Sequence, residues 1–440
     1  MRAPDRVLRW DVLALHLEEA GFLLGQRESA LRAHGYTLAE VAAGPEEDRL
    51  LAHLEALEVA GEGAARRLLL PALEADEPEL RTAAALALLG GEAAPQAAGG
   101  AFAAADGERR PSLARALQLS ERPGAGQAAL ALLDDPDEGK VVSALEVLAF
   151  RRALPAGRAA RLARDPRPLV RTAALRAGRV EPATVDRAVL EPALADGNPA
   201  VRSAALLTGL VSGRKAALRA ARERVAEAGA DGRLARLALA TGGTAADLER
   251  LIALLGEAGL RREALVALGY SGSVVAADGC LRWLGDDELG GVAAEAFAAI
   301  TGLELAGPLL REAPSEEGEE LPPLEEDLAN DLLPSDDAEL PLAEPGAVAT
   351  WWSEARKRLD PAARLLRGSP FQVGRLVTEL ERGSARRRAG LALELAIRSR
   401  GEVQLETGAL TAVQLQQLAA ARSAPSAGSW SARPFEAWMQ

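Results

Sequence analysis

Cysteine, histidine and aromatic side chains are scarce in this sequence of 440 residues. Cys280 is the single cysteine, which excludes a disulfide framework and a cysteine-based zinc site within one chain. The three histidines, His16, His34 and His53, fall within the first 53 residues, so no histidine-rich site can form elsewhere. Aromatic residues make up 3% of the chain, so alanine and leucine must form most of the core, and the 96 alanines favour helix over strand.

Long hydrophobic runs are also missing. No apolar run reaches the roughly 18 to 20 residues that a membrane-spanning helix needs. The N-terminal residues Met-Arg-Ala-Pro-Asp-Arg lack the apolar core and cleavage site of a signal peptide. We therefore expect a soluble cytoplasmic protein without a membrane partner. Arginine outnumbers lysine 48 to 3, which together with the alanine excess is typical of a GC-rich bacterial genome.

A proline-led motif recurs along the chain at intervals of about 30 residues. Its clearest copies are Pro78-Glu-Leu80-Arg81-Thr-Ala-Ala, Pro168-Leu-Val170-Arg171-Thr-Ala-Ala and Pro199-Ala-Val201-Arg202-Ser-Ala-Ala. The leading apolar positions of all copies are 80, 113, 141, 170, 201, 234, 260 and 292. One helix pair cannot bury its apolar face alone, so eight copies predict an all-α solenoid of about eight stacked helix pairs.

Each copy has signals for where its helices begin and end. Acidic or amide residues such as Asp76, Asp165 and Asn198 precede the prolines and can accept hydrogen bonds from the first amides of a helix. Glycines at 90, 178, 209, 269 and 302 are predicted to end the second helix of a pair. Short first helices are expected over 64–73, 128–133, 155–163, 185–193 and 246–255. In these repeats, over residues 63–305, the chain resembles HEAT-repeat proteins of the short bacterial type, which implies a fold and leaves the function open.

Both ends contain more specific segments. The N-terminal part includes His16-Leu-Glu18-Glu19 and Tyr36-Thr37-Leu38, and the C-terminal part includes Trp351-Trp352 and the run Arg386 to Arg388. Here the chain resembles a family of uncharacterised proteobacterial HEAT-repeat proteins, some of which are encoded near type VI secretion genes. The resemblance implies a bacterial cytosolic protein with a link to such an assembly, and it assigns no catalytic residue. Glu55-Ala56 stands where family members have Asp-Gly.

Two interpretations are open for the N-terminal histidines. His16 and Glu19 share a helix face and His53 could meet them, which would give a metal site of two histidines and a carboxylate. The alternative is a polar network that fixes the angle between two capping helices, with Arg27 and Arg49 as partners. We favour the network because terminal solenoid units are usually modified to protect the open end. The sequence therefore predicts no metal, no cofactor and no catalytic residue.

Composition changes divide the chain into five predicted regions. Two N-terminal helices are expected over 6–34 and 45–60, and four helices follow the insert over 347–366, 373–382, 385–399 and 411–421. The predicted regions are an N-terminal helical cap (1–62), a HEAT-like solenoid (63–305), an acidic proline-rich insert (306–346), a small C-terminal helical domain (347–422) and an aromatic tail (423–440).

Charge is distributed unevenly. Residues 311–345 hold thirteen acids, one base and six prolines, which opposes a packed core. Nine arginines and one acid lie between Arg151 and Arg179. We expect an intramolecular contact between the acidic insert and these basic repeats, or two solvated charge runs that never meet. Crosslinking would decide between them.

These features predict a non-enzymatic scaffold or adaptor that binds an unidentified protein partner. The alternative is a HEAT-fold enzyme or DNA-binding protein, lyase-like or glycosylase-like, that uses the solenoid groove. A nucleic-acid partner is disfavoured because the middle repeats lack tryptophan and tyrosine. The arginines also have a structural interpretation, as a ladder in which Arg81, Arg171 and Arg202 pair with capping acids, and the tail aromatics could pack onto their own helices. The candidate interaction surface comprises Arg151, Arg152, Arg158, Arg161, Arg164, Arg171, Arg202, Trp430, Phe435 and Trp438.

Overall fold

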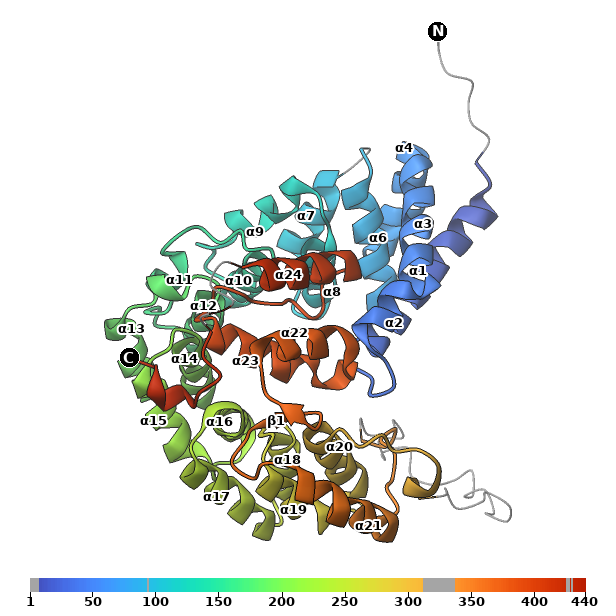
Figure 1. Ribbon diagram of the computed structural model, residues 1–440. Helices are drawn as coiled ribbons and strands as arrows, with labels where there is room; N and C mark the ends of the chain where they lie inside the picture. The colour runs from blue at the N-terminus through green and yellow to red at the C-terminus, as the bar shows by residue number, and fades with distance from the viewer. Residues whose placement is uncertain (1–7, 93–94, 312–336, 425–427, 429) are drawn as a thin grey trace, which may run out of the picture. The chain divides into compact units, whose positions relative to one another are not determined.

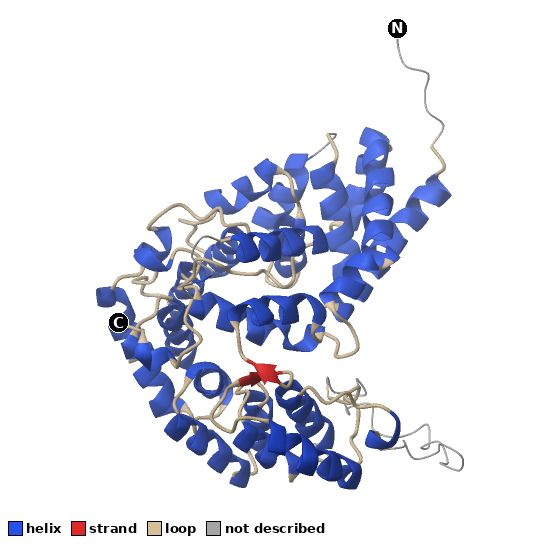
Figure 2. Cartoon of the chain, viewed as in Figure 1, coloured by secondary structure: helices blue, strands red, loops and turns tan. Residues whose placement is uncertain are grey.

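The computed structural model describes residues 8–92, 95–311, 337–424, 428 and 430–440. Within these residues the chain is almost entirely helical, and the only paired strands are β1 (Leu365–Leu366) and β2 (Ser369–Pro370), as Figure 2 shows. The predicted all-α solenoid is confirmed. No described helix has both the length and the apolar character needed to cross a membrane.

The contacts divide the chain into two compact units. Unit 1 comprises Met1–Ala220, Val377–Ser431 and Met439–Gln440, and unit 2 comprises Ala221–Leu376 and Ala432–Trp438. The residues after the insert are divided between both units, and the five predicted regions stay a prediction. Most of the acidic insert, residues 312–336, lies outside the described residues, so its predicted contact with the basic repeats stays a prediction.

Unit 1 is built on a row of long helices that pack one against the next. α1 packs on α3 and α6, and the row continues from α6 through α8, α10, α12 and α14. Figure 1 shows α23 (Arg388–Arg398) and α24 (Thr411–Ser423) on the inner side of this row. The long helices are α1 (Trp10–Ala30), α3 (Pro45–Val59), α6 (Pro78–Gly90), α8 (Arg110–Leu119), α10 (Glu138–Phe150), α12 (Pro168–Gly178) and α14 (Pro199–Val211).

Shorter helices form the first member of each pair and pack on the long helix that follows or precedes them. The turns between them use the predicted acids, because Asp165 and Asp196 each accept a hydrogen bond from the amide two residues later. Asn198 then accepts one from Ala200 N, as an N-cap should. The short elements of unit 1 are α2 (Leu38–Ala43), α4 (Gly61–Ala64), η1 (Ala65–Leu69), α5 (Leu70–Ala72), α7 (Pro95–Ala104), α9 (Gln127–Ala131), α11 (Arg158–Leu162) and α13 (Arg187–Leu194).

One predicted helix end in unit 1 is wrong. Gly209 lies inside α14, which continues to Val211, and the chain turns at Gly213 with a φ of 68°. A Cβ at position 209 would lie 2.7 Å from the Cβ of Ala217 and 3.0 Å from Leu190. This glycine therefore allows close packing between helices and does not end one. Gly90 and Gly178 do end their helices as predicted.

Unit 2 continues the alternation of helices. Its elements are α16 (Gly229–Gly242), α17 (Ala245–Ala253), η4 (Leu254–Gly256), α18 (Arg261–Leu268), α19 (Val274–Leu281), α20 (Gly290–Thr301) and α21 (Pro345–Ala355), while α15 (Lys215–Arg224) and α22 (Val373–Arg382) contain the boundaries between the units. Beside the undescribed part of the insert, Arg311 N donates to Leu342 O and Leu340 is buried. Arg262 pairs with Asp337.

The helix predicted over 347–366 is wrong in its second half. Helical structure ends at Arg358, and the chain then forms the β1–β2 hairpin around Arg367 and Gly368, which both have positive φ. The amides of Arg367 and Gly368 donate to Ala299 O and Ile300 O, two of the last carbonyls of α20. A helix leaves its last four carbonyls without internal partners, and the hairpin supplies these donors. A contact distant in sequence therefore overrides the local helical pattern.

Candidate functional site

The recurring arginine of the repeat motif has a structural role in unit 1. Arg81, Arg171 and Arg202 each donate to the backbone carbonyl six residues earlier, in the turn before their own helix. Arg171 also reaches the Asp196 carboxylate of the next repeat at 3.0 Å. Arg171 thus makes the predicted pairing with an acid, whereas the contact that Arg81, Arg171 and Arg202 have in common goes to a backbone carbonyl.

Other arginines of the predicted interaction surface, together with Arg167 and Arg179 of the same basic stretch, also find acceptors within unit 1. Most of these acceptors belong to the neighbouring repeat, so the guanidinium groups join successive helix pairs. The contacts are those of Arg151 with Leu117 O and Arg122 O, of Arg158 and Arg161 with Asp134, of Arg164 with Asp186, of Arg167 with Asp165, and of Arg179 with Glu406.

A loop from the C-terminal part of unit 1 lies along the inner side of the long helices. We call residues 399–411 the inner loop; it connects α23 to α24. Gln404, Leu405 and Ala409 in this loop are buried. The inner side of the long helices, where the alternative function would need an open solenoid groove, is therefore occupied here by the chain itself.

Four arginines from different repeats hold the inner loop. Arg152 donates to Gln404 O, and Arg179 donates to the Glu406 carboxylate at 3.2 Å. Arg115 donates to Gly408 O at 2.6 Å, and Arg27 donates to Ala409 O. Most of these bonds go to backbone carbonyls, so they fix the path of the loop with little dependence on its side chains.

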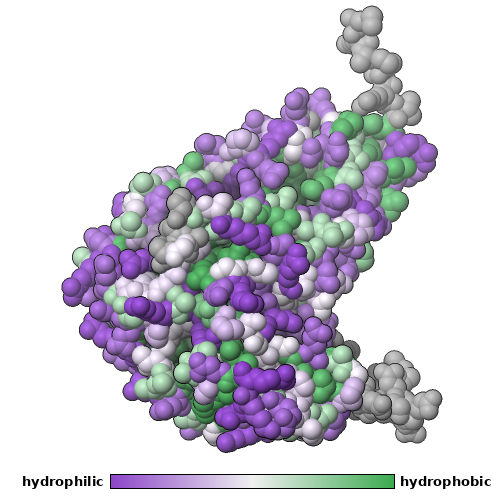
Figure 3. Space-filling view, viewed as in Figure 1, coloured by the Kyte–Doolittle hydropathy of each residue, from purple (hydrophilic) through white to green (hydrophobic). Residues whose placement is uncertain are grey.

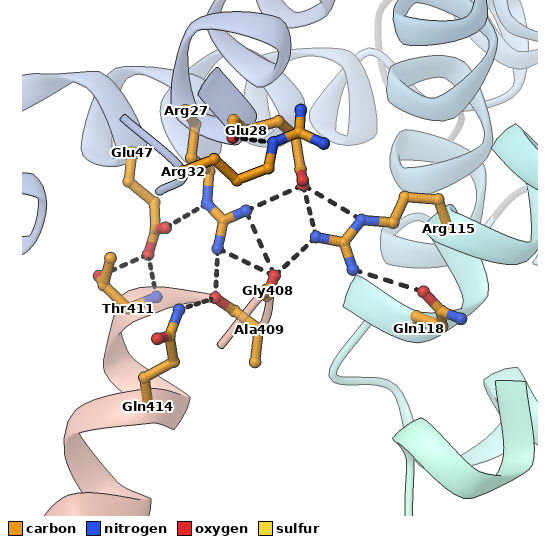
Figure 4. A network of polar contacts seen from close by, with 10 residues as sticks. All are labelled: Arg27, Glu28, Arg32, Glu47, Arg115, Gln118, Gly408, Ala409, Thr411 and Gln414. Carbon is orange, nitrogen blue, oxygen red and sulfur yellow. Dashed lines mark hydrogen bonds and ion pairs between the residues drawn. The ribbon is translucent and has the colours of Figure 1, made fainter. Parts of the chain in front are cut away.

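Figure 4 shows the polar network at the end of the inner loop, where Arg27 and Glu47 are both buried. Arg27 Nε lies 2.5 Å from Glu47 Oε2. Glu47 Oε1 accepts from the amide and the hydroxyl of Thr411 at 2.8 and 2.7 Å, which caps the start of α24. Gln414 Nε2 donates to Ala409 O at 2.6 Å. Nearly every polar atom of this buried network has a partner, which is what a stable buried ion pair requires.

Arg388 is a second buried cation beside α24. Its Nε donates to Leu380 O at 2.8 Å, and its Nη2 donates to Gln414 Oε1 at 2.5 Å. Burial lowers the pKa of the Arg388 guanidinium to about 10. The sequence analysis named Arg27 as a partner in a polar network between the two N-terminal helices, and Arg388 as part of a basic run. It did not predict that Arg27 reaches the inner loop or that Gln414 accepts from Arg388.

The N-terminal histidines do meet, at the interface of α1 and α3. His16 Nδ1 and His53 Nδ1 lie 2.7 Å apart, and Arg49 lies 3.5 Å from Glu19. Burial lowers the pKa of His53, and the nearby His16 and Arg49 lower it further, while Glu19 opposes them. Across the described residues, no group of three or more histidine, cysteine, aspartate or glutamate side chains is arranged to hold a metal ion. Of the two arginines predicted as partners of this network, Arg49 pairs with Glu19, whereas Arg27 pairs with Glu47 in the network of Figure 4.

The tail aromatics of the predicted surface pack onto their own units. Phe435 in unit 2 is fully buried, and its ring lies against Gly242, where a Cβ would be 2.3 Å from Phe435 Cγ. Trp438 contacts the Phe435 ring edge to face at 5.7 Å. In unit 1, Trp430 Nε1 donates to Glu402 at 3.3 Å. Burial removes Phe435 from the surface that a partner could contact.

An open groove remains on the outer side of unit 1, where α1 crosses the beginning of α6. It has a volume of about 590 Å³. We call it the α1–α6 groove; it is lined by Glu18, Gly21, Phe22, Gly25, Gln26, Glu77, Glu79 and Leu80. Phe22 is 63% exposed. The sequence did not predict this surface, because the exposed face of α1 is set by how α3 and α6 pack on the helix.

Those remaining apolar residues continue the groove along α1. Val12, Leu15 and Phe22 are all exposed, and their spacing of three and seven residues places them on one face of the helix. Figure 3 shows apolar side chains at the surface over the part of unit 1 formed by α1 and α3. This face, together with the α1–α6 groove, is the candidate binding site.

A second cavity, of about 680 Å³, lies between α6, α7, α8 and α9. Its lining is mostly apolar and includes Leu89, Leu117 and Leu132. The one charged residue in the lining, Arg122, already donates to Gly90 O. The charged group of this cavity is thus already paired within unit 1, in contrast to the carboxylates of the α1–α6 groove.

Comparisons with known proteins provide no family assignment. No family model matches the chain, and no curated protein matches it. Among solved structures, the chain is similar to an engineered protein with 20% identity and a TM-score of 0.30, over 65% of this chain and 89% of that one. It is also similar to the YibA protein of Escherichia coli, with 16% identity and a TM-score of 0.30, over 68% of this chain and 99% of that one.

Proposed function

We propose that this chain is a non-enzymatic scaffold or adaptor that binds a protein partner through the exposed apolar face of α1. The observation that supports this proposal is the exposure of Val12, Leu15 and Phe22 on one helix face. Single exposed apolar residues are ordinary on protein surfaces, but an aligned row beside a groove is typical of an interface. Solenoids usually end in a polar outer face, and α1 differs from that pattern.

The filled inner surface favours this proposal over the alternatives considered from the sequence. A lyase-like enzyme or a glycosylase-like DNA-binding protein would need an open groove along the repeats. In this chain the inner loop takes that place, and most arginines that could contact phosphate donate to carbonyls and acids of unit 1. A secretion-type assembly as the host complex rests only on the resemblance of the terminal segments.

Affinity purification with mass spectrometry from the native host tests the proposal. The bait would be the full chain, compared with Leu15→Glu/Phe22→Glu, which places charges on the exposed face without altering a buried residue. We expect specific partners with the unaltered chain and a loss of about 10-fold or more with the double variant. Leu169→Glu is the matched control, because Leu169 is 54% exposed on α12 of the same unit.

Two outcomes would contradict the proposal. One is recovery of the same proteins, in the same amounts, with the unaltered chain, the double variant and Leu169→Glu. The other is a turnover activity of the purified chain on a small molecule or nucleic acid. Circular dichroism and thermal unfolding of each variant would show that the exchanges leave the fold intact.

A further inference from the structure

We propose that the α1–α6 groove binds a cationic amphipathic helix of the partner protein. This inference rests on the proposed function and adds the chemistry of the partner. It follows from three properties of the groove: its apolar floor, its space for side chains, and carboxylates that no described residue neutralises.

Two glycines of α1 create the space. A Cβ at Gly21 would lie 3.2 Å from Leu80 Cα, so the absence of a side chain lets the beginning of α6 approach α1 closely. A Cβ at Gly25 would meet only Glu79 Cγ, at an ordinary contact distance of 3.5 Å. The groove therefore stays open at Gly25, with Phe22 and Leu80 beside it.

The charge of the groove has a single sign. Glu18, Glu77 and Glu79 line it, and its lining includes no arginine or lysine. None of these three glutamates forms an ion pair within the part of the chain that the structure describes, whereas nearby Glu19 pairs with Arg49 and Glu28 with Arg115.

Part of this charge has a structural explanation, and part does not. Glu79 lies in the first turn of α6, where a negative charge is favoured by the helix dipole. Glu18 lies in the middle of α1, where no such benefit exists. Glu18 is exposed and forms no ion pair with a described residue, so its carboxylate is available to a basic side chain of the partner.

The shape and charge together favour a helix as the occupant. An amphipathic helix can lay its apolar side chains across an apolar groove and place basic residues at the rim. Leu15 and Phe22 are two helical turns apart, roughly 10.5 Å, which matches the spacing of anchors on a partner helix. A second copy of this chain fits less well, because pairing two α1 faces would bring Glu18 and Glu19 of both copies together.

The direct test uses the full chain and a designed peptide. The probe is a labelled amphipathic helical peptide of about 18 residues, with leucines on one face and lysines on both flanks. The control peptide has the same leucines and glutamates at the lysine positions. We expect fluorescence anisotropy to show binding of the lysine peptide and at least about 10-fold weaker binding of the glutamate peptide. Binding should weaken as the ionic strength rises from about 0.05 M to about 0.3 M.

Two variants locate the binding on the groove. Glu18→Gln/Glu79→Gln removes charge at constant shape and should weaken the lysine peptide by about 10-fold. Gly25→Leu fills the groove without a clash at Cβ and should abolish binding of the lysine peptide. The free energy of unfolding of this variant should stay close to that of the unaltered chain. The matched controls are Glu62→Gln, on the neighbouring α4, and Gly100→Leu in α7, where a Cβ would meet nothing within 4 Å.

The outcomes separate this inference from the proposed function. Equal binding of both peptides, or lysine-peptide binding that survives Gly25→Leu, would overturn the cationic-helix inference, even if partners recovered from the host still depend on Leu15 and Phe22. A dimer in sedimentation equilibrium that Phe22→Glu dissociates would overturn it in favour of a second copy. If the lysine peptide binds as expected but the host yields no partner, the adaptor proposal fails and the groove chemistry stands.

Discussion

The inner side of unit 1 and the α1–α6 groove differ in whether their charged side chains have partners within the chain. On the inner side, Arg27 and Arg115 are surrounded by carbonyls and carboxylates of the same chain. In the groove, Glu18, Glu77 and Glu79 face solvent without a cation from the described residues. The charges of the inner side are therefore paired within the chain, whereas the carboxylates of the groove are exposed to solvent.

This difference shows that the number of charges alone does not identify a binding surface. The arginines between 151 and 179 form the most basic stretch of the sequence, yet the structure uses most of them to join repeats and to hold the inner loop. A buried ion pair costs desolvation, and what it provides is a defined arrangement of the groups around it. Exposed charges beside apolar side chains give specificity and faster association instead.

The largest expected effect comes from breaking the inner network. Arg27→Ala removes the cation from a buried pair, so Glu47 stays buried without its positive partner and Ala409 O loses one of its two donors. We expect the free energy of unfolding to fall by about 3–5 kcal/mol, measured by denaturant unfolding. Arg66→Ala, in an exposed pair with Glu62, should change it by no more than about 0.5 kcal/mol. Equal effects of the two variants would show that the inner network is not the stronger of the two interactions.

The next prediction compares two glycines, one at each surface. Gly401 of the inner loop has a φ of 81°, and a Cβ there would lie 2.6 Å from Pro182 Cγ. Gly401→Ala should lower the free energy of unfolding by about 2 kcal/mol or more, through backbone strain and overpacking. Gly25→Ala in α1 should instead raise it by about 0.5–1 kcal/mol, because alanine favours helix and the site has room. A destabilised Gly25→Ala variant would mean that the groove is less open than the structure indicates.

The histidine pair gives a pH-dependent prediction. The folded-state pKa of His53 lies below its ordinary value of about 6.5, because burial and the neighbouring His16 disfavour the imidazolium. As pH falls below about 6.5, the unfolded chain takes up a proton that the folded chain resists, so stability should decrease. Proton NMR should show His53 titrating below the ordinary range, and His16→Gln should move it upward. A His53 that titrates at or above about 6.5 would contradict this prediction.

The smallest expected effect is at the open groove itself. Glu18→Gln and Glu79→Gln remove charges that have no partner among the described residues. We expect each to change the free energy of unfolding by less than about 0.5 kcal/mol, in contrast to Arg27→Ala. Thermal unfolding of both variants beside the unaltered chain would check this. A decrease in the free energy of unfolding above about 1 kcal/mol would show that the groove acids stabilise the fold, as the inner network does.

Local patterns were sufficient for most of the solenoid. The prolines at 78, 168 and 199 begin helices as predicted, and the second N-terminal helix predicted over 45–60 agrees with α3. These features depend on capping and on helical spacing, which act within a few residues. The prediction was wrong where a distant contact decides the local structure, as at the β1–β2 hairpin, whose amides cap the carbonyls of α20.

The candidate site was harder to predict than the fold. The sequence pointed to the arginine-rich stretch, whose arginines are mostly paired in the structure, and to Phe435, which is buried. It did not predict an exposed apolar face around Phe22, because the exposure of a residue on α1 depends on which face of the helix its neighbours cover. A residue count cannot show whether a charge has a partner.

The sequence by itself determined that this chain is helical, that its helices repeat at intervals of about 30 residues, and that no disulfide can join them. Those properties follow from propensity, spacing and composition, which are local. Only the tertiary structure decided that the inner loop fills the concave side of unit 1 and that α1 keeps an open, acidic and apolar face. The physical reason is that partner choice for a charge and coverage of a surface both depend on residues that are hundreds of positions apart, as Arg27 and Ala409 are.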